Sequence, residues 1–254
     1  MSTTATTRSA QRAEAIVNTK PLLFGVLALA LFVAPLQTYE QAFGWTAGLD
    51  SFSPEFQIYW VRLLQGAIVL DVLGGAALIG YLWRTRDRNM SNLLPGAEMR
   101  RYVYLVQWLT MFALALFFGL SFFSEQTAVW HMTAIRDTDF TPSNIITFYI
   151  SYPLFAIIGI GAFFYARTRL PFFAKGFSLA FIVLVVGVFM TIPNVGFNEW
   201  GHTFWSMDEG FASPLHWGFV FFGWMSLAIF GVVLQILGRL RELFGDDGLL
   251  AIRR

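Results

Sequence analysis

Cysteine is absent from the 254-residue sequence. Its absence excludes disulfide bridges, thiolate metal sites, iron–sulfur clusters and cysteine nucleophiles. Charge is also scarce: charged residues make up 13% of the chain and hydrophobic residues 56%, whereas a soluble domain carries about 25% charged residues. The net charge of +1 implies no nucleic-acid partner. The low charged fraction and high hydrophobic fraction indicate an integral membrane protein.

Long apolar runs make up most of the chain. Six of them approach the roughly 20 residues needed to cross the hydrocarbon layer, namely Pro21 to Tyr39, Ile58 to Trp83, Tyr102 to Phe123, Asn144 to Ala166, Phe177 to Val195 and Leu215 to Leu237. We therefore predict an all-α integral membrane protein with about six transmembrane helices, which form a single domain over residues 21–240. Residues 1–20 are expected to be a mobile N-terminal tail, and residues 241–254 a C-terminal tail.

The distribution of positive charge predicts the orientation of these spans. Fifteen of the 17 lysines and arginines lie in the two tails or in the connections after the second and fourth spans, and only Arg62 and Arg136 do not. By the positive-inside rule both termini are cytoplasmic. The three other connections face outward and hold nine of the 16 acidic residues. All three histidines, His131, His202 and His216, belong to this acidic outer side.

Histidine is so scarce that its grouping is informative. Asn198 and His202 are four residues apart, so in a helical turn their side chains would share one face. His216 stands at the start of the last apolar run, where a returning helix could bring it beside them. The pattern predicts a metal site at the outer membrane face. The alternative is that these side chains serve only as interfacial hydrogen-bonding groups.

Asp71 is a carboxylate well inside the second predicted span. An unpaired charge there costs at least a few kcal/mol, so Asp71 should be paired, protonated or turned toward a polar cavity. Arg62, more than two turns earlier, is too distant for a simple pair. Proton handling and internal hydrogen bonding both remain open. A proton-coupled transporter would rest on Asp71 alone, without the repeats or broken helices of transporter folds.

Other sequence motifs with a known chemistry are missing. We find no internal repeat, no phosphate-binding glycine loop and no nucleophile motif in the sequence. The glycine pair in Gly159-Ile160-Gly161 instead favours close packing between helices. The predicted chemistry therefore rests on the candidate metal ligands.

Several segments resemble one family, the C subunit of the copper-containing membrane monooxygenases. This family includes particulate methane monooxygenase, ammonia monooxygenase and their short-chain hydrocarbon relatives. The resemblance is carried by Gly44 to Phe52, Gly80 to Asn89, Arg136 to Ser143, Arg169 to Gly176, Pro193 to Trp205 and Pro214 to His216. It extends over nearly the whole chain, from Tyr39 to Leu237.

The resemblance implies that Asn198, His202 and His216 form a copper site. Imidazole nitrogen with an amide oxygen suits copper or zinc better than magnesium or calcium, so zinc is possible in place of copper. The site would face the periplasm, from a bacterial cytoplasmic or intracytoplasmic membrane.

The family also has a second metal pattern, with an aspartate four residues before a histidine and another histidine thirteen residues after it. In this chain those positions hold Thr127, His131 and Asn144. Threonine and asparagine are weak, uncharged donors. We therefore predict that the second site is weak or lost, and that His131 has a structural role.

The resemblance further implies an enzyme subunit that acts only with A and B subunits, as a trimer of heterotrimers surrounded by membrane lipid. The complex would insert one oxygen atom of O₂ into methane, a short-chain alkane or ammonia, with quinol as reductant. An alternative is a structural subunit that assembles the complex and whose metal site is not catalytic.

Overall fold

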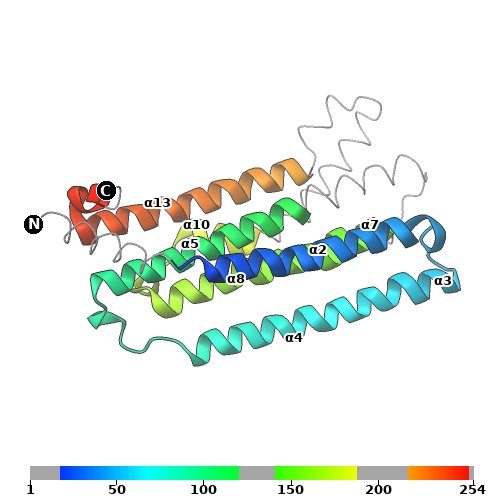
Figure 1. Ribbon diagram of the computed structural model, residues 1–254, viewed down its shortest axis with the longest axis horizontal. Coiled ribbons are helices and arrows are strands. Elements are labelled where there is room, and N and C mark those ends of the chain that lie inside the picture. The colour runs from blue at the N-terminus through cyan, green and yellow to red at the C-terminus, as the bar shows by residue number, and fades with distance from the viewer. Residues whose placement is uncertain (1–17, 120–140, 188–216, 252–254) are drawn as a thin grey trace, which may run out of the picture.

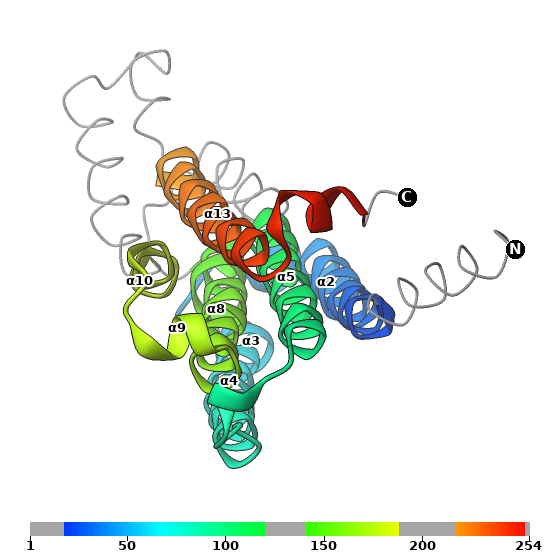
Figure 2. The ribbon, with the colours of Figure 1, turned by 90° about the vertical axis from the view of Figure 1, so that its left-hand side faces the viewer.

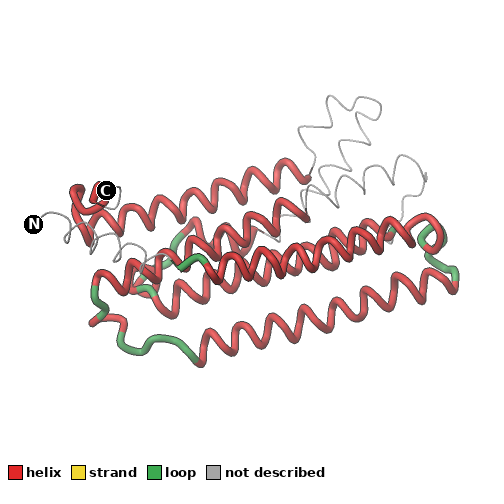
Figure 3. Tube along the Cα trace, viewed as in Figure 1, coloured by secondary structure: helices red, strands yellow, loops and turns green. Residues whose placement is uncertain are grey.

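The computed structural model describes residues 18–119, 141–187 and 217–251, and every regular element in these ranges is helical (Figures 1 and 3). The elements are α2 (Lys20–Ala47), α3 (Pro54–Phe56), η1 (Gln57–Val61), α4 (Arg62–Arg84), η2 (Met90–Asn92), α5 (Pro95–Phe118), α7 (Pro142–Asn144), η4 (Ile145–Ser151), α8 (Tyr152–Arg169), α9 (Pro171–Lys175), α10 (Leu179–Val186) and α13 (Trp217–Ala251). Two of them, η1 and η4, are π-helical segments that continue directly into α4 and α8.

Five stretches of the described chain are long and apolar enough to cross a membrane. They comprise α2, the continuous helix from α3 to α4, α5, the continuous helix from η4 to α8, and Gly223–Gly245 of α13. These helices confirm the all-α fold and agree with a multi-pass membrane protein. The fifth span expected from the sequence is described only in α10, so the total of six remains a prediction.

The spans lie side by side, with α5 and α8 in the middle (Figures 1 and 2). Helices α2, α4, α10 and α13 surround this pair. In the apolar part of the span that contains α8, 56% of the residues are buried. In the apolar part of the span that contains α4, only 6% are buried. The centre of the core is formed by Leu105 and Phe112 of α5 and by Phe155 and Ala162 of α8. Helix α4 therefore offers most of its surface to whatever surrounds the chain.

The helices begin where the sequence supplies helix-start residues. Pro95 and Pro171 occupy the first positions of α5 and α9, where a missing N–H costs nothing. The side chains of Ser53, Thr141 and Ser178 each accept a hydrogen bond from the backbone N–H three residues later. These caps satisfy N–H groups that have no partner within the helix.

Helix α13 continues past residue 240, where the sequence predicts the C-terminal tail to begin. It runs to Ala251, with a change of direction at Gly245, whose φ is 68°. Positive φ is strained for a residue with a Cβ, so glycine suits this turn. The first part of the predicted tail is thus helical.

Close helix packing at Gly159 and Gly161 is confirmed. A Cβ atom on Gly159 would lie 3.0 Å from Cε2 of Phe112, a residue of α5. A Cβ atom on Gly161 would lie 2.8 Å from Cζ3 of Trp108, also on α5. The two glycines therefore let the Phe112 and Trp108 rings of α5 lie closer to the backbone of α8 than they could beside an unshifted Cβ.

Substitution of Gly161 tests this contact. Gly161→Ala should lower the melting temperature of the purified complex, because the Trp108 ring must shift at a cost of about 1–3 kcal/mol. Gly74→Ala is the matched control, since nothing lies within 4 Å of a Cβ at this helical position. Its alanine should leave the melting temperature unchanged or raise it. Equal destabilisation by both variants would contradict the packing role of Gly161.

Candidate functional site

Most of the predicted metal ligands lie outside the described residues. This holds for Asn198, His202 and His216, and also for Thr127 and His131 of the predicted weak site. The described ranges contain none of the three histidines, and within them no group of three His, Asp or Glu side chains could hold a metal ion. Asn144 and Asp71 are the two predicted residues that the structure describes.

Asn144 lies where the chain enters η4, and it is 6% exposed. Its backbone N–H donates to Oγ1 of Thr141 over 3.1 Å. The neighbouring Pro142 packs on the turn after α2, since a Cβ on Gly48 would collide with Cγ of Pro142. Asn144 is therefore held in packed structure at the end of the bundle that the charge distribution predicts to face outward. We call this end the outer end.

An aromatic cluster holds the helices together at this outer end. The rings of Tyr39 and Trp60 have centroids 5.4 Å apart, and those of Phe43 and Tyr59 stack at 4.6 Å. The Tyr39 hydroxyl donates to the backbone carbonyl of Tyr59 over 2.8 Å. That carbonyl belongs to η1, where the helix changes its hydrogen-bonding register. The cluster thus fixes the π-helical segment against α2.

The sequence predicts Glu40 in a connection that faces outward, but the residue lies within a helix. It is part of α2 and is 7% exposed, beside the aromatic cluster. Polar Glu40 and Gln41 had ended the predicted span at Tyr39, yet α2 continues to Ala47. Packing of the aromatic residues extends this helix beyond the limit set by hydropathy.

The opposite end of the bundle is basic. Eleven of the 12 described lysines and arginines lie at the end where α2 begins and α13 ends, and Arg62 at the start of α4 is the exception. We call this end the basic end. It agrees with the charge asymmetry seen in the sequence.

A group of polar contacts at the basic end joins α4, α5 and α8. Nη2 of Arg101 lies 2.7 Å from Oδ2 of Asp87, and Nη1 of Arg101 donates to the Arg169 carbonyl. Arg169 in turn donates to the hydroxyl groups of Thr85 and Thr168. The Asn89 N–H, Arg101 and Arg169 together lower the pKa of the Asp87 carboxyl. We call these contacts the Asp87 clasp.

A second ion pair joins α5 to α13. Glu98 is 2% exposed and lies 3.0 Å from Nε of Arg239. Tyr102 donates to the same carboxylate over 3.3 Å, and Arg239 also pairs with Glu242 at 2.8 Å. Since a buried charge without a partner is strongly destabilising, this pairing fixes how α13 lies on α5.

The Asp87 clasp predicts a pH dependence of stability. The folded pKa of Asp87 is depressed, so its contribution is present above the unfolded pKa of about 3.9 and is lost as pH falls through the folded pKa. Asp87→Asn should therefore lower the melting temperature at pH 7 and have a progressively smaller effect below about pH 4. Thermal melts of both proteins across this range provide the measurement. A difference that does not change with pH would exclude the ionic role.

Asp71 lies within α4, partly buried, far from either end of the span. Its Oδ2 is buried without a hydrogen-bond partner among the described residues, and no ion pair within them involves it. Proton handling and internal hydrogen bonding by Asp71 both stay predictions.

Asp71→Asn tests which of the two roles applies. Because the carboxylate has no described partner to lose, the variant should keep or raise the melting temperature of the complex. Loss of a structural hydrogen bond would instead cost about 1–3 kcal/mol. Glu98→Gln is the matched control, since that carboxylate is paired and its loss should destabilise the protein. If Asp71→Asn lowered the melting temperature as much as Glu98→Gln does, Asp71 would have a structural partner.

The charged contacts at the basic end were not predicted as pairs. Asp87, Arg101 and Arg169 lie in or beside short connections. From the sequence, the two arginines served only to assign the topology, and Asp87 was noted only within a family-like segment. Glu98 and Arg239 are separated by 141 positions, so no local spacing could have joined them. The family-like segments around residues 80–89 and 169–176 were the only local signal that this end is specialised.

Together these features define a multi-pass helical membrane protein with a charged, self-paired basic end and an aromatic outer end. The chain belongs to the family of the C subunit of ammonia monooxygenase/methane monooxygenase, whose model matches residues 3–247. This match confirms the family expected from the sequence segments, and it identifies the protein as part of a monooxygenase complex. A comparison with curated proteins finds no match.

Proposed function

We propose that this chain is the C subunit of a copper-dependent membrane monooxygenase that acts with A and B subunits. The complex would oxidise methane, a short-chain alkane or ammonia with O₂, with quinol as reductant. The observation that carries the proposal is the family match over residues 3–247, which includes the predicted ligand segments. The apolar, multi-pass helices support a membrane location for the reaction.

The donor set of Asn198, His202 and His216 fits copper. Imidazole nitrogen suits copper, and the chain has no cysteine thiolate that would compete with the two histidines. A reduced copper ion bound there would supply the activation of O₂. The chain's residues would hold the ion at the outer face, on the predicted connection between the fifth and sixth spans.

The apolar interior of the bundle would offer substrate and O₂ a dry route toward this site. Phe112 and Phe155 are fully buried between α5 and α8, and their rings meet edge to face with centroids 6.2 Å apart. The apolar interior offers water no hydrogen bonds, whereas O₂ and a small hydrocarbon dissolve readily in such surroundings. Exclusion of water protects an oxidising species from side reactions.

Metal analysis of histidine variants tests the copper site. In the purified complex, His202→Ala and His216→Ala should each lower the copper affinity and the turnover. The loss of affinity should exceed roughly 10–100-fold, which is the effect of losing a residue that only hydrogen-bonds to a metal ligand. His131→Ala is the matched control, because its predicted site lacks two of three ligands. This variant should retain copper bound at the main site.

The measurements also separate the proposal from its alternative. Unchanged copper and turnover in His202→Ala would refute the copper site. Loss of copper with full turnover would identify a structural subunit whose metal is not catalytic. Growth substrate and product assays on native membranes would then identify the substrate.

A further inference from the structure

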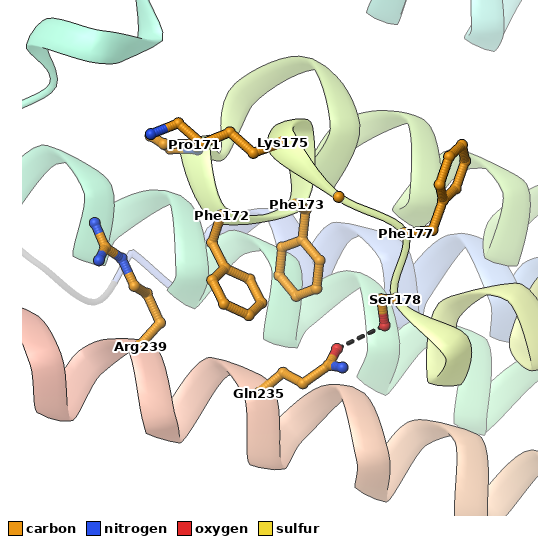
Figure 4. A pocket seen from close by; sticks show the side chains of 9 residues that line it. Pro171, Phe172, Phe173, Lys175, Phe177, Ser178, Gln235 and Arg239 are labelled. Carbon is orange, nitrogen blue, oxygen red and sulfur yellow. Dashed lines mark hydrogen bonds between the residues drawn. The ribbon is translucent and has the colours of Figure 1, made fainter.

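A pocket of about 390 Å³ lies at the basic end, between α9 and α13 (Figure 4). Its lining combines phenylalanine rings with two cationic side chains, Lys175 and Arg239. Figure 4 shows both cationic groups on one side of the pocket and Phe177 on the other. The pocket is therefore charged at one end and aromatic at the other.

The cationic end retains unused hydrogen-bond donors. Lys175 is exposed and has no ion pair or hydrogen bond among the described residues. The guanidinium of Arg239 uses Nε and one N–H of each terminal nitrogen for Glu98 and Glu242. A guanidinium carries five N–H groups, so two remain. These donors suit an anionic oxygen.

The floor of the pocket adds a neutral donor. The Ser178 hydroxyl accepts from the Phe181 N–H and donates to Oε1 of Gln235 over 2.6 Å. The Gln235 carbonyl oxygen is thus occupied, which leaves its NH₂ group available. Figure 4 shows this contact between the two walls.

Arg167 holds in place the wall of the pocket that residues 171–178 form. Its Nη1 donates to the carbonyls of Phe173 and Gly176, over 2.7 and 2.6 Å. Its guanidinium also lies 5.1 Å from the centre of the Phe177 ring. The wall is therefore preformed, so a ligand need not order it on binding.

The surface beyond the pocket is apolar. On α10, Leu179, Ile182 and Val186 are exposed at spacings that place them on one helix face. On α13, Leu227, Phe230 and Leu234 form a similar exposed row. A free inorganic anion would not contact these apolar surfaces, whereas the acyl chains of a lipid would cover them.

We propose that this pocket binds the phosphate headgroup of an anionic phospholipid, with its acyl chains along α10 and α13. Basic pockets between transmembrane helices on the cytoplasmic side recognise anionic headgroups. Lys175 and Arg239 pair with the phosphate, Gln235 donates to a headgroup oxygen, and Phe172 and Phe177 lie at the level of the membrane surface. The site is independent of copper.

Lysine labelling tests the site, because the chain contains only two lysines, Lys20 and Lys175, and both lie at the basic end. The full complex would be placed in phosphatidylcholine nanodiscs with or without phosphatidylglycerol, and the acetylation of each lysine followed by mass spectrometry. Phosphatidylglycerol should slow acetylation of Lys175 several-fold relative to Lys20, which reports the general surface potential. Inorganic phosphate added to phosphatidylcholine discs should give no such protection.

A binding measurement provides the matched comparison. Lys175→Gln should raise the phosphatidylglycerol concentration for half-saturation, measured by native mass spectrometry, about fivefold, which corresponds to about 1 kcal/mol for one lysine at a membrane surface. Lys20→Gln should leave it unchanged. Equal protection of both lysines, equal protection by inorganic phosphate, or a Lys175 that is unreactive in phosphatidylcholine alone would each overturn the proposal.

Discussion

The approach of α8 to α5 is the contact on which the other helices depend. Gly159 and Gly161 place no side chain between the two backbones, so the rings of Phe112 and Trp108 fill the space directly above α8. Within a membrane no hydrophobic force drives helices together, because lipid tails are as apolar as the helices themselves. Close van der Waals packing must therefore provide the association, and it is densest at this pair. Helices α2, α4, α10 and α13 then pack around it.

Among the described residues the ion pairs lie at the basic end of the bundle. Between the ends, hydrocarbon surroundings offer no water to an unpaired polar group. At the basic end, the contacts of Asp87, Arg101 and Arg169 join the ends of α4, α5 and α8. The ion pair of Glu98 with Arg239 joins α13 to them. At the outer end, aromatic stacking and the Tyr39 hydroxyl replace ion pairs. Asp71 is a carboxylate far from either end of its span, so both a functional and a structural role stay open for it.

Hydropathy and charge predicted much of the fold. Apolar length identified the spans, and the charge distribution placed most cations at one end, because both follow from the cost of moving polar groups into hydrocarbon. The ends of the helices were harder to predict. Helix α2 extends past Glu40 because Tyr39 and Phe43 pack on η1, and such a contact between distant segments has no trace in a local hydropathy average. The pairing of Glu98 with Arg239 was unpredictable for the same reason.

The candidate metal site shows the opposite balance. Four-residue spacing of Asn198 and His202 is compatible with many structures, so spacing alone left the chemistry open. Family resemblance supplied the specificity, and the family match over residues 3–247 now supports it. The described scaffold adds a physical reason for the location. Ion pairs among the described residues occupy the basic end, while the outer end is held by neutral aromatic contacts. The sequence predicts all three histidines on the outer side. A cationic metal is better accommodated away from a dense group of arginines, so the charge asymmetry that orients the protein also favours a copper site on the outer side.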